Sequence, residues 1–292
     1  VVCDGETIVH VNTSFAVLSG VPASELIGTR LDGCFPDRTA RAALKSGQPV
    51  ETALRQADGT ATPVELILRP IEFAGKPHHV VAVRDLQARK QAEQHIHYLA
   101  HHDGLTALPN RGHFNARIDQ EIAALGKDER LAVLCLDLDR FKEVNDLFGH
   151  AAGDAVLQAA ASRVSALLGE RQMMARLGGD EFAILLPGIA DANAAGRLAE
   201  TVLETLRMTG DVPEINGISS SIGIAVYPDD ATDRHTLLTH ADTALYRAKS
   251  EGRNTYRFFE ANMGSEVRQR RLLEHDLRLA IARGEMRLVY QP

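Results

Sequence analysis

The stretch RLGGDEFAILLP (residues 176–187) decides how the second half of this 292-residue chain folds. It predicts two apolar strands joined at Gly178 and Gly179, because paired glycines allow positive φ and keep a tight turn clear of side chains. Asp180 and Glu181 follow the turn, so a ligand could lie on the backbone with two carboxylates beside it. Taken alone, such a pair is more often a solvated hairpin tip than an active site.

A second acidic strand end lies upstream, in LAVLCLDLD (residues 131–139). Side chains alternate along a strand, so Asp137 and Asp139 are expected on one face. Charge at the end of an apolar strand needs a partner, and Asp and carbonyl oxygens are hard ligands that suit Mg2+. If the hairpin pairs with this strand, Asp137 and Asp180 can share a metal ion.

Hydrophobic spacing around these two stretches predicts an α+β domain. Helical periodicity covers residues 114–125, 156–168, 198–208 and 237–249. Compact apolar runs at residues 131–138, 182–186, 219–227 and 255–259 predict strands. The order strand, helix, two strands, helix, strand is the split βαβ plan of ferredoxin-like folds, in which helices back an antiparallel, palm-like sheet.

The first region, residues 1–84, predicts a separate small antiparallel sheet with helices, because short alternating runs follow turn dipeptides. Residues 85–102 then turn polar and helical, with an apolar stripe that includes Ile96 and Leu99. A helix that joins two domains can carry a signal between them. His97 and His101 have the i, i+4 spacing of a metal-chelating pair, although a solvated helix end is the simpler explanation.

Composition excludes several classes of function. The 32 Lys and Arg against 39 Asp and Glu give a formal charge of -7, which argues against nucleic acid as a partner. No apolar run reaches the roughly 20 residues of a membrane span, so we expect no membrane contact from this fragment. Three scattered cysteines favour a cytoplasmic protein over a disulfide framework. Without an initiator Met or signal-like stretch at Val1, we expect the chain to be cut from a longer one.

The sequence lacks the motifs of other nucleotide-binding folds. It contains no GxxxxGK[ST], no two glycines spaced as GxG, and no GxSxG nucleophile elbow. A palm-like sheet with carboxylates and scattered Lys and Arg fits phosphoryl or nucleotidyl transfer.

The string VNTSFAVLSGVPASELIGTRL (residues 11–31) resembles the opening of a PAS sensory domain. The residues at that family's spacings are Asn12, Phe15, Gly20, Glu25, Leu26 and Gly28. The resemblance implies an N-terminally truncated PAS domain over residues 1–84, a fold whose sheet often holds a small ligand, flavin or haem. No residue here dictates such a ligand, so a ligand-free dimerisation module is an equal alternative.

The second region, residues 103–260, resembles the GGDEF domains, the diguanylate cyclases. RLGGDEF matches the family signature. Three further motifs occur in the family's order: DGLTALPNR (103–111), with Ala107 replacing the usual Gly, LDLDRFKEVNDLFGHAAGD (136–154) and ADTALYRAKSEGRN (241–254). The family makes cyclic di-GMP from two GTP, so the resemblance implies a PAS domain joined by a signalling helix at residues 85–102 to a catalytic palm.

The resemblance carries the family's metal and catalytic roles onto matching positions. Asp137, the carbonyl of Leu138 and Asp180 would hold Mg2+, with Mn2+ as an alternative ion. Asp180 would also accept the proton of the attacking hydroxyl, and Glu181 belongs to the same catalytic loop. The substrate would lie across the turn at residues 178–179.

Nucleotide-binding roles carry over in the same way. Asn145 and Asp154 would read guanine, because a carboxylate accepts from guanine N–H groups while an amide offers both a donor and an acceptor. Lys142, in the catalytic machinery, would neutralise the triphosphate together with Lys249 and Arg253, which are expected one turn apart on a helix face. A solvated basic face is the alternative for these three residues.

A GGDEF domain holds one GTP, so the resemblance implies a homodimer with two chains face to face across a two-fold axis. Activity should then depend on dimer geometry. The PAS domain and the joining helix would control it by shifting the population of productive dimers.

One departure from the family concerns product binding. Many members carry an Arg-x-x-Asp site whose Arg lies nine residues before the first signature Gly. The corresponding residues here are Gly169, Glu170, Arg171 and Gln172, so neither defining residue is present. We expect weak or absent feedback inhibition through that site.

Residues 265–292, which include LEHDLRLAIARGEMRLVYQP (273–292), resemble the first helix and strand of an EAL domain, a cyclic di-GMP phosphodiesterase. Only the opening is present, so this fragment should lack phosphodiesterase activity. In the parent protein the GGDEF unit could be a non-catalytic GTP-binding regulator of an adjoining phosphodiesterase. A PAS scaffold that needs no GTP is a third hypothesis, and it leaves the intact catalytic positions unexplained.

Overall fold

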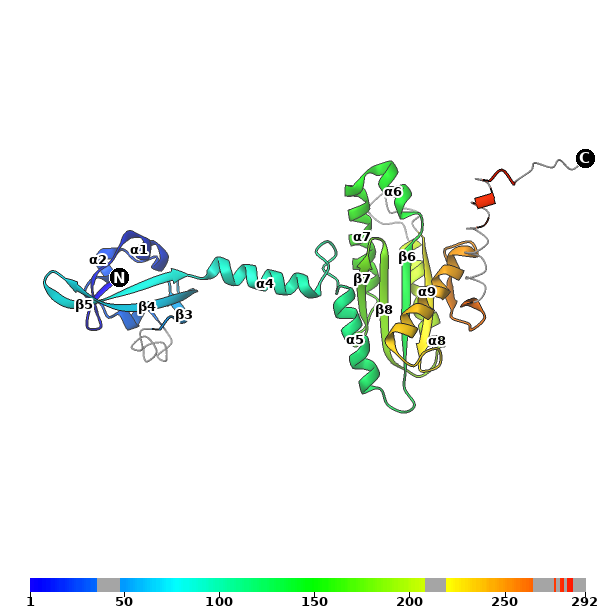
Figure 1. Cartoon of the computed structure of the whole chain (residues 1–292), viewed down its shortest axis with the longest axis horizontal. Helices are drawn as coiled ribbons and strands as arrows, with labels where there is room; N and C mark the ends of the chain where they lie inside the picture. Colours follow the sequence, from blue (N-terminus) through cyan, green and yellow to red (C-terminus); the bar gives the residue numbers. More distant parts are fainter. Residues whose placement is uncertain (36–47, 208–218, 265–275, 277–278, 281–282, 286–292) are drawn as a thin grey trace, which may run out of the picture. The chain divides into compact units, whose positions relative to one another are not determined.

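A computed structural model of the chain describes residues 1–35, 48–207 and 219–264, with 276, 279–280 and 283–285. The chain divides into two compact units, Val1–Tyr98 and Leu99–Pro292. Each unit combines a five-stranded sheet with helices (Figure 1), which confirms the predicted α+β class. Most of the EAL-like segment lies outside the described residues. Across the described parts of the chain, every helix is too short or too polar to span a bilayer.

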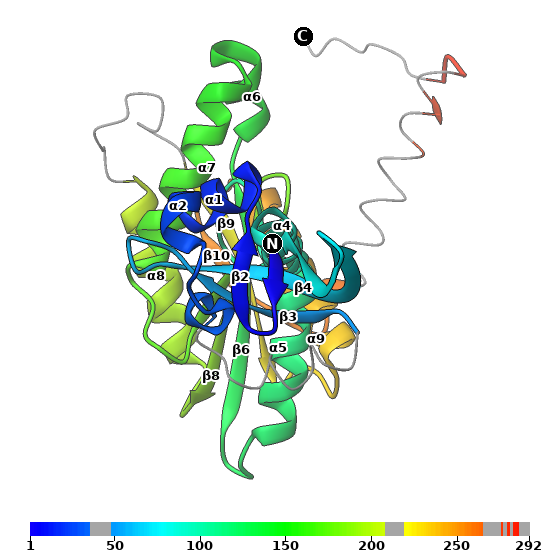
Figure 2. The ribbon, with the colours of Figure 1, turned by 90° about the vertical axis from the view of Figure 1, so that its left-hand side faces the viewer.

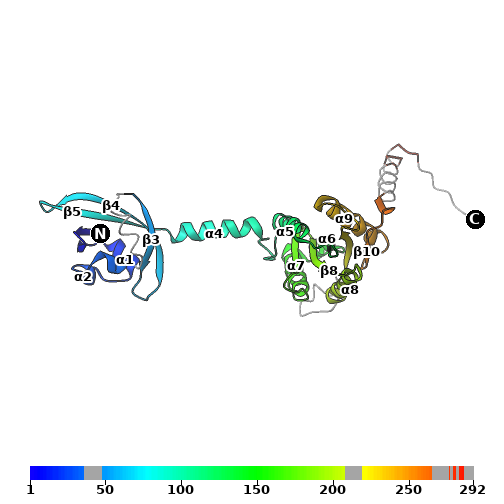
Figure 3. The same cartoon turned by 90° about the horizontal axis from the view of Figure 1, so that it is seen from below.

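The first unit is an antiparallel sheet with short helices, as predicted. Its strands, in the order β2-β1-β5-β4-β3, are β1 (Val2–Asp4), β2 (Thr7–His10), β3 (Val50–Arg55), β4 (Ala61–Phe73) and β5 (Lys76–Asp85). Its helical segments are α1 (Thr13–Ser19), α2 (Ala23–Leu26) and the 3-10 helix η1 (Leu31–Cys34). Helices α1 and α2 lie on the same side of the sheet (Figure 3) and share one apolar cluster with it.

Residues that suggested a PAS domain have clear structural roles. The side chain of Asn12 caps α1 by accepting a hydrogen bond from the backbone N–H of Phe15 (3.0 Å). Phe15 and Leu26 are buried in the core of the unit. Gly20 ends α1 at φ 67°, a left-handed conformation that glycine adopts without strain.

The predicted joining helix forms as α4 (Gln87–His101). The side chain of Asp85 accepts a hydrogen bond from the backbone N–H of Gln87 (2.7 Å) at its start. Ile96 is 68% exposed and Leu99 is 43% exposed, so the apolar stripe faces solvent in a single chain. The side chain of His97 lies outside the described residues, so the hypothesis of a chelating pair with His101 stays untested.

The second unit follows the ferredoxin-like plan. Its strands, in the order β10-β9-β6-β8-β7, are β6 (Arg130–Leu138), β7 (Met173–Gly178), β8 (Glu181–Ile189), β9 (Ser220–Tyr227) and β10 (Tyr256–Phe258). Its helices are α5 (Arg111–Ala124), α6 (Phe141–Phe148), α7 (His150–Ser165), α8 (Asn193–Arg207) and α9 (Arg234–Ser250). The central strand, β6, is antiparallel to both β8 and β9. The expectation of an antiparallel sheet fails at one edge, because α9 crosses over and returns β10 parallel to β9.

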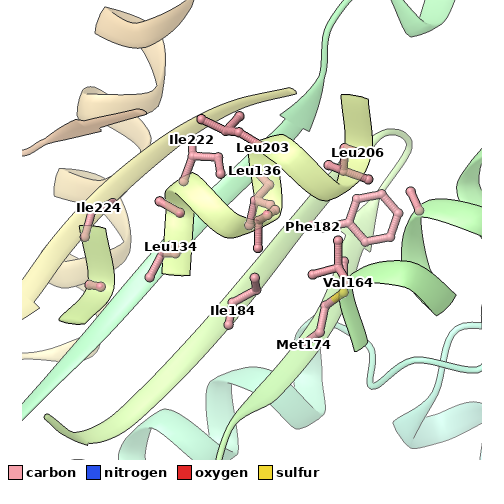
Figure 4. Packing of buried hydrophobic residues seen from close by; sticks show 14 of the residues in the cluster. Leu134, Leu136, Val164, Met174, Phe182, Ile184, Leu203, Leu206, Ile222 and Ile224 are labelled. Carbon is pink, nitrogen blue, oxygen red and sulfur yellow. The ribbon is translucent and has the colours of Figure 1, made fainter. Parts of the chain in front are cut away.

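Strand β6 is buried on both faces, which explains its continuous apolar run. Leu134 and Leu136 pack among side chains of α7 and α8 on one face of the sheet (Figure 4). Val133 packs on the opposite face with Phe114 of α5 and Leu237 of α9. Because side chains alternate along the strand, the next acidic position, residue 137, falls on the face covered by α5 and α9.

Helices α6 and α7 extend beyond the end of the sheet (Figure 1 and Figure 2). Asp139 and Arg140 alone separate β6 from α6, and Arg140 turns the chain at φ 59°. The residues of α6 are therefore held close to the acidic end of β6.

Helix α9 lies directly on β9 at Gly223. A Cβ built there would stand 2.1 Å from the carbonyl oxygen of Ala241 and 2.1 Å from the amide nitrogen of Leu245. We predict that Gly223→Ala lowers the free energy of unfolding by about 3 kcal/mol, measured by urea denaturation, because no rotamer relieves a clash with backbone. A Cβ built at Gly169 meets no atom within 4 Å. Gly169→Ala should therefore change the free energy of unfolding by less than about 0.5 kcal/mol. Equal effects of the two substitutions would contradict the close approach.

Candidate active site

The acids predicted at the two strand ends are adjacent in the sheet. Strands β6 and β8 pair with Asp137 opposite Glu181. The backbone N–H of Leu138 donates to the carbonyl oxygen of Asp180 (3.4 Å). The prediction that the hairpin pairs with the acidic strand is therefore confirmed, and backbone pairing brings the acids together.

The turn between β7 and β8 is open to a ligand and firmly anchored. Gly178 has φ 141° and Gly179 has φ 55°, as predicted, and nothing lies within 4 Å of a Cβ built on either. Arg176 donates to the carbonyl of Gly179 from Nε (3.0 Å) and Nη2 (2.8 Å), and from Nη1 to Asp103 (3.0 Å). Burial opposes the ionisation of Asp103, but hydrogen bonds from Thr106 and Arg176 hold its pKa below the ordinary value. One guanidinium thus ties the turn to the segment that follows α4.

Asp137 is largely buried and has a lysine as its partner. Lys249 Nζ is 2.6 Å from Asp137 Oδ2, and 13% of the Asp137 side chain is exposed. Burial raises the pKa of Asp137 above its ordinary value, Lys249 opposes the shift, and the charges of Asp180 and Asp139 add to it. Negative charge is therefore concentrated at this end of β6, where a divalent cation could neutralise it.

Asp139 has a structural role. Its carboxylate is nearly buried and accepts hydrogen bonds from the hydroxyls of Ser219 (2.7 Å) and Ser221 (2.7 Å) and from the backbone N–H of Asn254 (3.0 Å). The sequence suggested a cation as the natural partner for carboxylates at this strand end. For Asp139, the partners are instead donors on β9 and in the loop after α9, which it ties to β6.

The remaining donors fit Mg2+ bound together with a nucleotide. Within the described ranges, no three His, Cys, Asp or Glu side chains form a cage for a metal ion. Proteins usually hold Mg2+ by one or two carboxylates together with water and substrate phosphates. Asp137, Asp180 and the carbonyl of Leu138 are donors of this kind.

The residues expected to read guanine come from α6 and α7. Asn145 packs against Gly153, where an added Cβ would lie 2.0 Å from Asn145 Oδ1. Asp154 is the next residue and is exposed, and Lys142 lies exposed in the first turn of α6. The structure therefore places these three predicted residues on adjoining helices, close to the end of β6.

The prediction that Lys249 and Arg253 lie one turn apart on a helix is wrong. Helix α9 ends at Ser250, and Arg253 is exposed in the following loop at φ 64°. The physical reason is Gly252, whose φ of 121° takes the chain out of the helical path.

A pocket of about 120 Å³ beside Glu181 lies between α5 and α9 and is partly open to solvent. Arg111, the first residue of α5, stands at this pocket. It donates from Nε to the carbonyl of Leu177 (3.1 Å) and from Nη2 to Glu181 Oε2 (3.4 Å). Sequence reasoning missed Arg111, whose only signal was its place in the motif DGLTALPNR, and also missed the contact between Arg176 and Asp103.

Comparison with known protein families covers both units. Residues 100–255 match the family described as diguanylate cyclase, GGDEF domain, and residues 1–88 match the PAS domain family. The chain belongs to the GGDEF family. Both resemblances are thereby confirmed, while the EAL resemblance of residues 265–292 stays a prediction.

Curated relatives show the same relationship. An uncharacterized signaling protein of Caulobacter vibrioides is 40% identical over 304 residues, which cover 100% of this chain and 37% of that protein. The bifunctional diguanylate cyclase/cyclic di-GMP phosphodiesterase MucR of Pseudomonas aeruginosa is 44% identical over 205 residues, covering 69% of this chain and 30% of MucR. Diguanylate cyclase TpbB of the same species is 43% identical over 180 residues, covering 60% of this chain and 41% of TpbB. The chain thus spans between 30% and 41% of the length of these relatives.

Solved structures agree with the fold of the second unit. The GGDEF domain of TpbB from Pseudomonas aeruginosa gives a TM-score of 0.55 at 42% identity, covering 57% of this chain and 99% of that one. The coiled coil and GGDEF domain of DgcB from Caulobacter crescentus, in complex with c-di-GMP, gives 0.52 at 29% identity, covering 59% and 91%.

We predict that Asp137→Asn raises the melting temperature of the metal-free protein near neutral pH. A raised pKa in the folded state means that folding disfavours the charged form, so stability is lost as the pH rises through that pKa. Below the ordinary Asp pKa of about 3.9, both states are protonated and the difference should vanish. Calorimetry with a chelator at acidic and neutral pH measures this, with the exposed Asp154→Asn as the control. A lower melting temperature of Asp137→Asn at neutral pH would contradict the dominance of burial.

Proposed function

We propose that this chain is a diguanylate cyclase that condenses two GTP into cyclic di-GMP and two pyrophosphates under the control of its PAS domain. The observation that carries the proposal is the pairing of Asp137 with Glu181 beside the open turn at residues 178–179, with Lys249 next to Asp137. The match to the diguanylate cyclase GGDEF domain family and the similarity to TpbB support it.

The reaction would be an in-line displacement at phosphorus. The 3′-hydroxyl of one GTP attacks the α-phosphorus of the other, a P–O bond forms and pyrophosphate leaves with its bonding electrons; the reciprocal attack closes the ring. Bound Mg2+, held by Asp137, Asp180 and the Leu138 carbonyl, would lower the pKa of the hydroxyl and stabilise the leaving charge. Asp180 would accept the hydroxyl proton.

The chain's other predicted residues would orient the nucleotide. Asn145 and Asp154 would pair with the donor and acceptor groups of guanine. Lys142, Lys249 and Arg253 would neutralise the triphosphate with charge-assisted hydrogen bonds. The bare backbone of the turn would let the substrate approach closely, because neither glycine has a side chain there.

Two chains would be needed, because one domain presents one such site and cyclisation joins two nucleotides. The exposed Ile96 and Leu99 of α4 form an apolar stripe that a second copy of the helix could cover. The PAS unit and α4 would then regulate turnover by shifting the population of productive dimers.

The parent protein would be of the PAS-GGDEF-EAL type. The resemblance of residues 265–292 to an EAL domain supports this, as does the similarity to MucR, a bifunctional diguanylate cyclase/cyclic di-GMP phosphodiesterase. The alternative is a non-catalytic GTP-binding regulator of the phosphodiesterase. Catalysis is favoured because the acids expected to act in it, Asp137, Asp180 and Glu181, lie together beside the turn.

Mg2+-dependent conversion of GTP to cyclic di-GMP, followed over a range of protein concentrations, tests the proposal. The rate should rise faster than linearly with concentration, since the active species is a dimer. Asp180→Ala should lower the rate by about 100- to 1000-fold while the fold is retained. Arg197→Gln, an exposed change on α8, is the control. GTP binding without turnover at any concentration would contradict the proposal and favour the regulatory alternative.

Product inhibition should be weak, because neither defining residue of the Arg-x-x-Asp site is present at residues 169–172. Arg171 Nη2 is 3.7 Å from Glu121 Oε2, and Glu121 also pairs with Arg117 (2.7 Å). We expect micromolar cyclic di-GMP to leave the initial rate unchanged in both the wild type and Arg171→Ala. Inhibition in the wild type that disappears in Arg171→Ala would contradict this prediction.

A further inference from the structure

Arg111 contacts Glu181 at the candidate active site, but its side chain stays largely exposed to solvent. Its guanidinium is anchored at Nε by the Leu177 carbonyl (3.1 Å), and its Nη2 is 3.4 Å from Glu181 Oε2. The side chains of Arg111 and Glu181 are 58% and 51% exposed, and both line the pocket between α5 and α9. An exposed pair of this length is weak, so a stronger cation can break it without disturbing the core.

The two opposed carboxylates of the sheet are therefore both neutralised by side chains of the same chain. Lys249 pairs with Asp137, and Arg111 pairs with Glu181. Asp180 adds a further negative charge beside the turn, and this charge acts on Asp137. A divalent cation that binds here meets a positive charge already placed on Glu181, and like charges at such short range repel.

We propose that Arg111 is the counter-ion of Glu181 and that a divalent metal ion held by Asp137 and Asp180 displaces it, because the two cations compete for the negative charge of these adjacent carboxylates. The inference rests on the metal-dependent function proposed above. Displacement would leave the guanidinium fork at the mouth of the pocket with its Nη donors released, while the bond from Nε to Leu177 keeps it near the turn. Arg111 is thus a positioning residue that sets the metal affinity of the site before any nucleotide binds.

Titration of the whole chain with Mn2+ in the absence of nucleotide tests the competition. The electron paramagnetic resonance signal of the free aqueous ion reports how much Mn2+ is bound. Arg111→Gln keeps a hydrogen-bond donor but removes the charge, and it should bind Mn2+ about two- to fivefold more tightly than the wild type. Arg111→Lys keeps the charge and should bind with wild-type affinity. Arg197→Gln removes one exposed positive charge on α8 and should leave the affinity unchanged.

A double-substitution comparison shows whether the effect passes through Glu181. In a Glu181→Gln background the competing carboxylate is gone, so Arg111→Gln should no longer tighten Mn2+ binding. Loss of Mn2+ binding in Asp137→Asn would show that the titrated ion binds at this site. Far-ultraviolet circular dichroism confirms that each variant is folded.

Four results would overturn the proposal: unchanged or weaker Mn2+ binding by Arg111→Gln, an equal shift in Arg111→Lys, a shift that persists in the Glu181→Gln background, or no Mn2+ site that depends on Asp137. The measurement uses no nucleotide, so it is separate from the cyclase assay. A chain that shows the expected Mn2+ pattern but makes no cyclic di-GMP refutes the proposed function and leaves this inference standing.

Discussion

The site depends on the register in which β6 pairs with β8. That register sets Asp137 opposite Glu181 and joins the N–H of Leu138 to the carbonyl of Asp180. Because side chains alternate along a strand, a slip of one residue would turn Asp137 into the apolar layer against α7 and α8 and away from Lys249. The pairing of two apolar strands therefore determines where the charge of this domain is concentrated.

At this end of the sheet, burial opposes the negative charge that the proposed metal site requires. Burial makes the charged form of Asp137 unfavourable, and the neighbouring acids add to the effect. Other contacts stabilise this end of the sheet. The carboxylate of Asp139 accepts hydrogen bonds that join β6 to β9 and to the loop after α9. Arg176 fixes the turn to Asp103, two residues after α4, so the turn and the joining helix are mechanically linked.

Periodicity and turn chemistry were sufficient to predict the strands of the second unit, its helices α5, α7, α8 and α9, and the approach of Asp137 to Asp180, because each depends on local patterns and one simple topology. Features that depend on contacts between distant segments were not predictable. The donors that satisfy Asp139 are the hydroxyls of Ser219 and Ser221 and the backbone N–H of Asn254, which lie 80, 82 and 115 residues away along the chain. Gly252 removes Arg253 from α9 by a single backbone angle, which no hydrophobic spacing encodes.

The position of a bound metal ion tests the proposed site. Crystals of the chain grown with Mn2+ and a non-hydrolysable GTP analogue would reveal the ion by its anomalous scattering. We predict an ion bound by the carboxylates of Asp137 and Asp180 and the carbonyl oxygen of Leu138, together with phosphate oxygens of the nucleotide. An ion bound elsewhere, or a bound nucleotide whose metal does not contact Asp137, would contradict it.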